Sequence, residues 1–347
     1  MGIRASWEIR YGIVVKTGIT STATFASGNG IGLKSNYFGL LLTNNPSFEA
    51  GKSIVDTPKS FGRAQRVGGT GGEYQAEREA PSVTLEMEAD RYCMALFGWL
   101  LFQKGASESS GASPYAKTYV PYRSGTGTGE ATNAAEPEIY AVLLKDFSGD
   151  TSTAAEHHVI LGAICKSMKI AGSEGGAITL SAEMVGADFT NTFTESSLVL
   201  TPTDLAPLLF KDLTFTVGGV TNLIGSFDIT ITNNAAPKSY NSGTISNYVL
   251  GKVIVTGSVS MPWSDANAAG MIDAYLSQTP QTLVFKWGTA SSTLVQLTIP
   301  ARITNAPLDA SGEELMVSVS FEGVWYSADY PSVTMVVEDS VLRSIPA

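Results

Sequence analysis

The feature that most constrains the fold is an alternation of apolar and polar residues with a period of two, which recurs along the whole chain. Such runs, rich in Thr, Val, Ile and Ser, predict β-strands that bury one face. The clear cases span residues 82–88, 177–185, 212–217, 226–232, 252–261, 293–299, 315–323 and 332–338. So many half-buried strands must pair with one another, so we predict a mainly β fold.

Only two segments have the pattern of helices. Residues 90–102 are almost wholly apolar and begin with Asp90, which can cap the free N–H groups of a helix, so we expect this helix to be buried around most of its circumference. Residues 265–276 begin with Ser264 or Asp265 as candidate caps, and their apolar stripe consists of Met271, Ile272, Tyr275 and Leu276. Three long stretches, residues 26–36, 44–79 and 105–137, predict loops, which at this length are usually functional or disordered.

The two halves of the chain echo each other. Thr-Asn-Asn at 43–45 and Pro-Lys-Ser-Phe at 58–61 recur as Thr-Asn-Asn at 232–234 and Pro-Lys-Ser-Tyr at 237–240. The strands at 83–87 and 255–259 then precede the two helices, and hairpin patterns follow at 164–186 and 299–323. We interpret this as a tandem duplication, with a first unit at 1–200 that carries an inserted loop around 105–137 and a second unit at 201–347. A single large sandwich with accidental likeness is the alternative.

The composition of the chain limits the classes of function that it can have. Charged residues make up only 16% of the chain, against about 25% in an ordinary soluble domain, which suggests surfaces that partners cover. The net charge is −10, both halves are acidic, and there is no basic stripe, so stable binding to nucleic acid is not expected. We find neither a secretory leader nor an apolar run long enough to span a membrane.

The candidate catalytic groups have simpler interpretations. The two histidines, His157 and His158, have no Cys or carboxylate at metal-ligand spacing. Glu86 and Glu88 share one face of a strand, as expected for a solvated or lumen-facing surface rather than for a glycosidase pair. Lys166 and Glu183 are interpreted as ordinary strand charges or as an ion pair between subunits. We therefore expect no enzyme, no catalytic residue, no metal and no cofactor.

Three further patterns are weak. Ala-Gly-Lys-Ser at 50–53 has Pro46 where a phosphate-binding loop needs Gly, and the glycines at 28–32 lack dinucleotide-binding spacing. Cys93 and Cys165 lie in apolar surroundings and are expected to be buried free thiols, although the sequence leaves a disulfide between them open.

The order of strand, helix, strands and then a hairpin resembles the major tail tube proteins of long-tailed bacteriophages. Residues 160–186 look like the characteristic hairpin of that family, in which a strand led by Gly turns at Gly-Gly into a Ser-x-Glu-x-x-Gly strand. Residues 210–263 resemble the second half of its longer members. The likeness covers roughly residues 40–340 as a pattern of strands and turns, with no catalytic signature.

The resemblance implies tandem β-sandwich or barrel domains, each with one packed helix. Six domains would form a ring whose inner sheets join into a continuous barrel, and rings would stack into a hollow tube. Three copies of a duplicated chain would complete a ring, whereas an undivided domain would need six. The long loop at 44–79 and the N-terminal residues 1–18 would reach neighbouring subunits.

The expected function is that of a structural virion protein of the tail, made in the cytoplasm of the bacterial host. Its partners would be other copies of itself, the tape measure, the tail terminator and the baseplate or initiator, with viral DNA passing through the lumen without specific binding. A carbohydrate-binding or adhesive module built on exposed aromatic residues is the alternative, with Trp263, Trp287, Trp325 and Tyr326 as candidates. A hydrolase that uses His157 or His158 is the third hypothesis.

Overall fold

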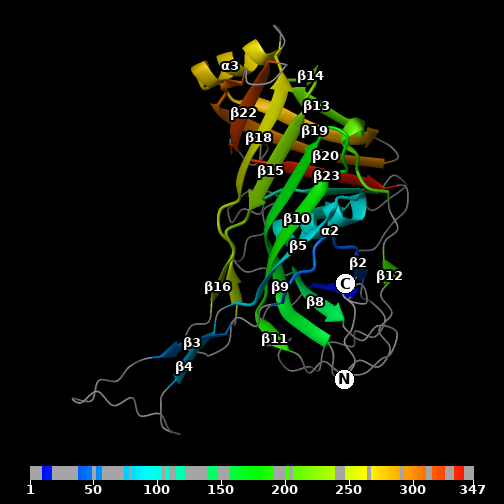
Figure 1. Ribbon diagram of the computed structural model, residues 1–347, viewed down its shortest axis with the longest axis vertical. Helices are drawn as coiled ribbons and strands as arrows, with labels where there is room; N and C mark the ends of the chain where they lie inside the picture. Colours follow the sequence, from blue (N-terminus) through cyan, green and yellow to red (C-terminus); the bar gives the residue numbers. More distant parts are fainter. Residues whose placement is uncertain are drawn as a thin grey trace, which may run out of the picture.

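The structure is a computed structural model of the chain. It describes residues 10–17, 38–48, 52–56, 74–78, 80–103, 106–108, 115–121, 139–146, 157–190, 201–202, 206–238, 247–263, 267–289, 293–309, 315–324 and 332–339, and all structural statements below concern these residues. The body is elongated and mainly β, which confirms the predicted fold class (Figure 1).

One antiparallel sheet, which we call the long sheet, passes through both halves of the chain. Its strands lie in the order β5 (Ser82–Glu88), β10 (Thr179–Val185), β9 (His157–Ser173), β15 (Ser226–Thr232), β18 (Ile254–Pro262) and β22 (Met316–Gly323). The halves meet where β9 pairs with β15, and Ile170 there lies opposite Ile229. The predicted strands at 82–88 and 226–232 have the predicted bounds.

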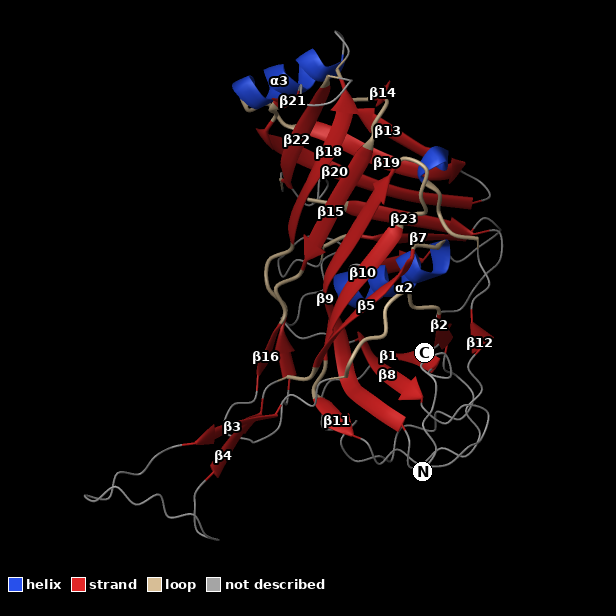
Figure 2. Cartoon of the chain, in the orientation of Figure 1, coloured by secondary structure: helices blue, strands red, loops and turns tan. Residues whose placement is uncertain are grey.

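A second sheet packs behind the upper part of the long sheet (Figure 2). Strand β20 (Thr293–Asn305) pairs through its last residues with β22 and through the rest with this second sheet. The order of the second sheet is β14 (Val220–Asn222), β13 (Leu213–Val217), β19 (Gln281–Thr289), β20, β23 (Thr334–Asp339), β7 (Tyr115–Tyr119) and β6 (Ala106–Glu108). Short elements complete this end: the 3-10 turn η3 (Phe210–Asp212), β21 (Leu308–Asp309) and helix α3 (Asn267–Ser277).

A smaller sheet extends the opposite end of the body. It contains β2 (Phe38–Leu40), β1 (Arg10–Thr17), β8 (Ile139–Asp146), the first part of β9 and β11 (Asp188–Thr190), with β12 (Thr201–Pro202) parallel to β2. Strand β9 belongs to both sheets, and within it Gly162 has a φ of 60°, which a side chain would disfavour. A glycine at this point therefore lets one strand leave the small sheet and enter the long one.

Helix α2 (Arg91–Phe102) lies in the core, where it contacts β9 of the long sheet as well as β7 and β23 of the second sheet. The Asp90 side chain accepts a hydrogen bond from the backbone N–H of Cys93 at 2.7 Å, which confirms the predicted cap. All residues of α2 are buried except Arg91 and Trp99. The predicted burial around most of the circumference is therefore confirmed. The candidate caps of α3, Ser264 and Asp265, lie outside the described residues.

Two of the predicted loops contain strands. Within 44–79, β3 (Lys52–Asp56) and β4 (Tyr74–Arg78) form an antiparallel ribbon that projects from the body (Figure 1). A second ribbon, β16 (Ala236–Lys238) with β17 (Asn247–Val249), occupies the corresponding place before β18. Within 105–137, β7 pairs with β23, whose sequence lies near the other end of the chain. The loop prediction was wrong for these strands, and for β7 the reason is that local sequence does not reveal so distant a partner. Residues 26–36 lie outside the described part.

The same strand connectivity occurs twice. Strands β5, β10 and β9 are neighbours in the first half, as β18, β22 and β20 are in the second. Both hairpins carry a β-bulge at the same place, where Lys166 is skipped opposite Glu183 and Met184, and Thr304 is skipped opposite Ser320 and Phe321. A β-bulge locally bends the strand and disrupts the ladder, so its recurrence is a specific likeness.

The strand pairing corrects two details of the sequence echo. Thr84 lies opposite Glu183 and Ser258 opposite Ser320, so β5 and β18 correspond two residues away from the match of 83–87 with 255–259. The Thr-Asn-Asn segments are not equivalent either. The backbone N–H of Thr43 donates to the carbonyl of Glu86 near the end of β5, whereas Thr232 faces Ile254 at the start of β18.

Candidate functional site

The outer face of the long sheet, opposite the core, is polar along its full width. Alternation turns the apolar residues of each strand inward, so Ser, Thr and charged side chains remain outside. Exposed or half-buried members of this face are Thr84, Glu86, Glu88, Ser181, Glu183, Lys169, Asp228, Thr230, Thr256, Ser258, Ser318, Ser320 and Glu322. Such a surface is wettable, and Ile254, which is 40% exposed at the start of β18, is its one exposed large apolar side chain among the described residues.

The basic side chains of this outer face are paired with acids. Lys166 Nζ lies 2.8 Å from Glu183 Oε1, and Lys169 Nζ lies 2.6 Å from Asp228 Oδ2, across the seam between β9 and β15. A looser pair joins Arg302 to Glu322 at 3.8 Å. From the sequence, Lys166 and Glu183 were interpreted as ordinary strand charges or as an ion pair between subunits, whereas the structure pairs them within one chain.

Glu86 and Glu88 add uncompensated negative charge to the outer face. Both are exposed on β5, and neither carboxylate forms an ion pair with another residue of the described ranges. The predicted sharing of one strand face is confirmed by the pattern of burial along β5. With the cations neutralised by neighbours, the face as a whole is acidic.

The free edge of the long sheet lies at β5. In an antiparallel strand the N–H and C=O of one residue point to the same side, and those of Thr84 and Glu86 point away from β10. Only the segment at Thr43 and Asn44 contacts them among the described residues: Thr43 N donates to Glu86 O at 2.8 Å, while the Asn44 side chain bonds Thr84 O at 3.1 Å and Glu86 N at 3.2 Å. The equivalent edge of β18 pairs with all of β15. Of these four backbone groups only the N–H of Thr84 has no partner among the described residues, so the edge is partly covered and lacks a full partner strand. An incompletely paired edge of this kind can accept a strand from another chain.

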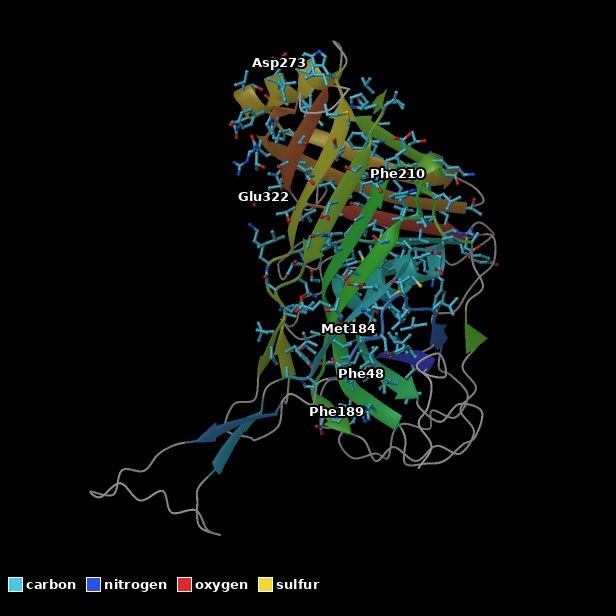
Figure 3. The ribbon with its side chains drawn as sticks, viewed as in Figure 1. Phe48, Met184, Phe189, Phe210, Asp273 and Glu322 are labelled. Atoms are coloured by element: carbon cyan, nitrogen blue, oxygen red, sulfur yellow. The ribbon has the colours of Figure 1, made fainter. Side chains whose placement is uncertain are left out.

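The histidines lie in the small sheet, away from this edge. His158 faces Lys145 of β8, and its ring lies 5.4 Å from that of Phe189 (Figure 3 labels Phe189). Burial, and secondarily Lys145, hold the pKa of His158 below its usual value. Lys145 Nζ donates to the carbonyl of Pro46 at 2.6 Å and to Asn45 Oδ1 at 3.2 Å. No three His, Cys, Asp or Glu side chains in the described ranges are placed to share a metal ion.

Both cysteines are buried free thiols, as predicted. The Cys93 thiol donates to Asp90 Oδ2 at 3.6 Å, and the Cys165 thiol donates to the carbonyl of Ser167 at 3.4 Å. Burial raises the pKa of each thiol well above its usual value. Both therefore stay in the unreactive protonated form at neutral pH.

We expect neither thiol to react with an aromatic disulfide reagent in the folded chain at pH 8. After denaturation two thiols per chain should titrate within minutes, because only the unfolded chain exposes them and restores their ordinary pKa. Absorbance of the released thiolate measures both stages. Rapid reaction of one thiol in the native protein would contradict the burial described above.

Of the remaining sequence candidates, those that the structure describes do not gather into a site. Trp287 is buried and Trp263 is half-buried against the core, so neither offers the exposed aromatic platform that carbohydrate binding requires. Trp325 and Tyr326 lie outside the described residues, as do the glycines at 28–32. Of the Ala-Gly-Lys-Ser segment, Lys52 and Ser53 belong to strand β3.

Sequence reasoning missed the role of Asn233, although it singled out the Thr-Asn-Asn motif. The buried Asn233 amide donates to Leu101 O at the end of α2, at 3.1 Å, and to Cys165 O on β9, at 2.8 Å. Its side-chain oxygen accepts from Ala235 N at 3.0 Å. The Asn233 side chain therefore links α2 and the bulged strand β9 to the segment of the second half that directly follows β15.

Comparison with known proteins agrees with this architecture. The sequence matches the family model described as phage tail tube protein over residues 15–323, which is most of the chain. No curated protein matches the sequence. Neither of the helices in the described ranges is long and apolar enough to cross a membrane. The match confirms the resemblance seen in the hairpin at 160–186: the chain belongs to the phage tail tube protein family and is a structural component of the virion tail.

Proposed function

We propose that copies of this chain join edge to edge through the long sheet into closed rings, and that the rings stack into the tail tube through which DNA leaves the virion. The observation that carries this proposal is the seam between β9 and β15, where the two halves of one chain already form a continuous sheet. Head-to-tail contacts close into rings when the rotation between copies permits. The same kind of seam between chains would extend the sheet around a bore.

Tandem duplication sets the number of chains in a ring. The repeated connectivity and the shared bulge at Lys166 and Thr304 support one unit at 1–200 and a second at 201–347. Three copies would then supply six units. The insertion around 105–137 would tie the units together, because its strand β7 pairs with β23 of the second unit. The β3–β4 ribbon, which projects from the body in Figure 1, would reach a neighbouring subunit or ring.

The outer face of the long sheet would line the bore. Its carboxylates repel phosphate, and its cations are held by neighbouring acids, as in the pairs of Lys166 with Glu183 and of Lys169 with Asp228. Affinity for nucleic acid comes mainly from cations that neutralise phosphates. DNA could therefore slide along this face without being held by it.

The proposed role of the chain is assembly, with no catalytic step. Its further partners would be the tape measure inside the growing tube, the tail terminator at one end and the baseplate or initiator at the other. Electron microscopy of the purified chain, at high concentration and with the initiator added, tests the proposal directly. Rings or tubes are expected, and protein that stays monomeric with and without the initiator would overturn it.

A proline in β5 should block assembly without unfolding the chain. Thr84 is exposed and its N–H points to the free edge, so Thr84→Pro removes an edge donor and places a ring where a partner strand would pair. We expect the unfolding midpoint to stay close to that of wild type and tubes to disappear. Circular dichroism and negative-stain microscopy measure the two effects.

The matched control is the equivalent position in the second half. Ser258 lies inside the sheet, opposite Asp228 of β15, so Ser258→Pro removes a hydrogen bond of the ladder itself. This variant should lose monomer stability. Normal tubes formed by Thr84→Pro would show that β5 is not the edge at which copies join.

A further inference from the structure

The second half of the chain is open at a place where the first half is closed. Two residues mark the difference in each half. Ile170 and Ile178 of the first hairpin are both fully buried, whereas Leu308 is 52% exposed and Leu315 is 39% exposed in the second. Exposed large apolar side chains in the second half, at positions whose counterparts in the first half are buried, indicate a surface that a partner covers.

Strand pairing shows that these residues are equivalent. Ile170 lies opposite Leu180 on β10, and Leu308 lies opposite Val317 on β22, each in the same position after the bulge. The next contact also repeats. Ala89 N donates to Ile178 O at 2.7 Å in the first half, and Trp263 N donates to Leu315 O at 2.8 Å in the second. Leu308 and Leu315 therefore correspond to Ile170 and Ile178.

The residues that close the first half come from the second half. The backbone of Leu208 forms hydrogen bonds with two residues of the first half: Ile178 N donates to Leu208 O at 2.8 Å, and Leu208 N donates to Ala89 O at 2.7 Å. Phe210 and Phe227 converge with Ile178 around Gly172, where the methyl group of an alanine would meet all three side chains. Strand β15 then pairs along β9 next to them.

Among the residues that the structure describes, the second half has no such cover. Within the described ranges no backbone group pairs with the N–H of Leu315 or the C=O of Trp263, the counterparts of the groups that Leu208 satisfies. Elements β14, α3, β21 and the start of β22 gather at this end of the body (Figure 2). The described part of the chain has seven exposed large apolar residues, and five belong to these elements or lie directly beside them: Val220, Leu223, Leu276, Leu308 and Leu315.

We propose that the open end at Leu308 and Leu315 is the surface on which the first unit of the next copy docks, in the way that the second unit docks on the first within one chain. This inference rests on the proposed ring assembly and adds the residues that form its lateral contact. The partner is a second copy because, within one chain, the second unit already covers Ile170 and Ile178, the counterparts of Leu308 and Leu315, by apolar contact and by backbone hydrogen bonds. The other side of the contact would be the free edge of β5 with the segment at Thr43 and Asn44.

The test is the double variant Leu308→Glu/Leu315→Glu, studied as the full chain by gel filtration, thermal unfolding and negative-stain microscopy. Both side chains are partly exposed already, so the variant should fold with an unfolding midpoint near that of wild type and remain monomeric. Thr214→Glu on β13 is the matched control, since this exposed residue faces Lys286 across the strands of the second sheet. The control should form tubes like wild type.

A mixing experiment separates the two surfaces of the contact. The double variant keeps an intact β5 edge, so it should bind the open end of a wild-type copy and stop the ring there. Adding one part of variant to two parts of wild type should therefore reduce tube formation several-fold. Normal tubes from the double variant alone would overturn this inference while leaving the proposed function in place. Failure of wild type to assemble with the initiator would overturn the proposed function itself.

Discussion

Replacing Asn233 with leucine should lower the free energy of unfolding by roughly 3–5 kcal/mol, because each buried polar group left without a partner costs about 1–3 kcal/mol. The substitution leaves the carbonyls of Leu101 and Cys165 without their donor and Ala235 N without its acceptor. Urea unfolding of the unassembled chain, followed by tryptophan fluorescence, measures the change.

The neighbouring Asn234 is the control. It is exposed, donates one side-chain hydrogen bond to Lys252 O at 2.8 Å and has a φ of 51°, which glycine adopts without strain. Asn234→Gly should therefore cost less than about 1 kcal/mol, the typical net contribution of one such hydrogen bond. Equal losses in the two variants would show that Asn233 does not hold α2 and β9 together.

Replacing Phe97 with alanine should destabilise the chain by about 3–5 kcal/mol, the range observed when a large aromatic side chain is removed from a packed core. Phe97 is fully buried in α2, between the long sheet and the second sheet. The cavity would therefore weaken the contact of both sheets with helix α2.

Arg91→Ala at the start of the same helix provides the comparison. The Arg91 side chain is 22% exposed and its ion pair with Asp339 is long, at 3.6 Å, so the expected loss is at most about 1 kcal/mol. Both variants are compared by the same denaturant titration. A loss from Phe97→Ala as small as that from Arg91→Ala would mean that α2 is not packed as described.

Local pattern predicted some strands and missed others for an identifiable reason. Strand β5 alternates buried and exposed residues along its whole length, and its period of two was visible in the sequence. Strands β1 and β8 are buried on both faces over their described side chains, so their sequences show a continuous apolar run without alternation. Such a run does not distinguish a strand from a buried helix.

The sequence repeat did not predict which residues of β5 and β18 correspond. The match of 83–87 with 255–259 placed β18 two residues away from its true counterpart of β5. A shift of two residues keeps every side chain on its original face. The alternation of buried and exposed residues therefore cannot distinguish the two registers. The bulges at Lys166 and Thr304 reveal the true correspondence, and only strand pairing shows them.

The sequence by itself determined the fold class, the buried helix begun by Asp90, the polar face that carries Glu86 and Glu88, and the resemblance to tail tube proteins. These follow from periodicity and capping, which depend on residues close together in the chain. Only the tertiary structure decided that β9 meets β15, that β5 ends the sheet and that Leu308 and Leu315 stand open. Those features depend on which distant strands become neighbours, and alternation states which side of a strand is buried but not which strand lies beside it.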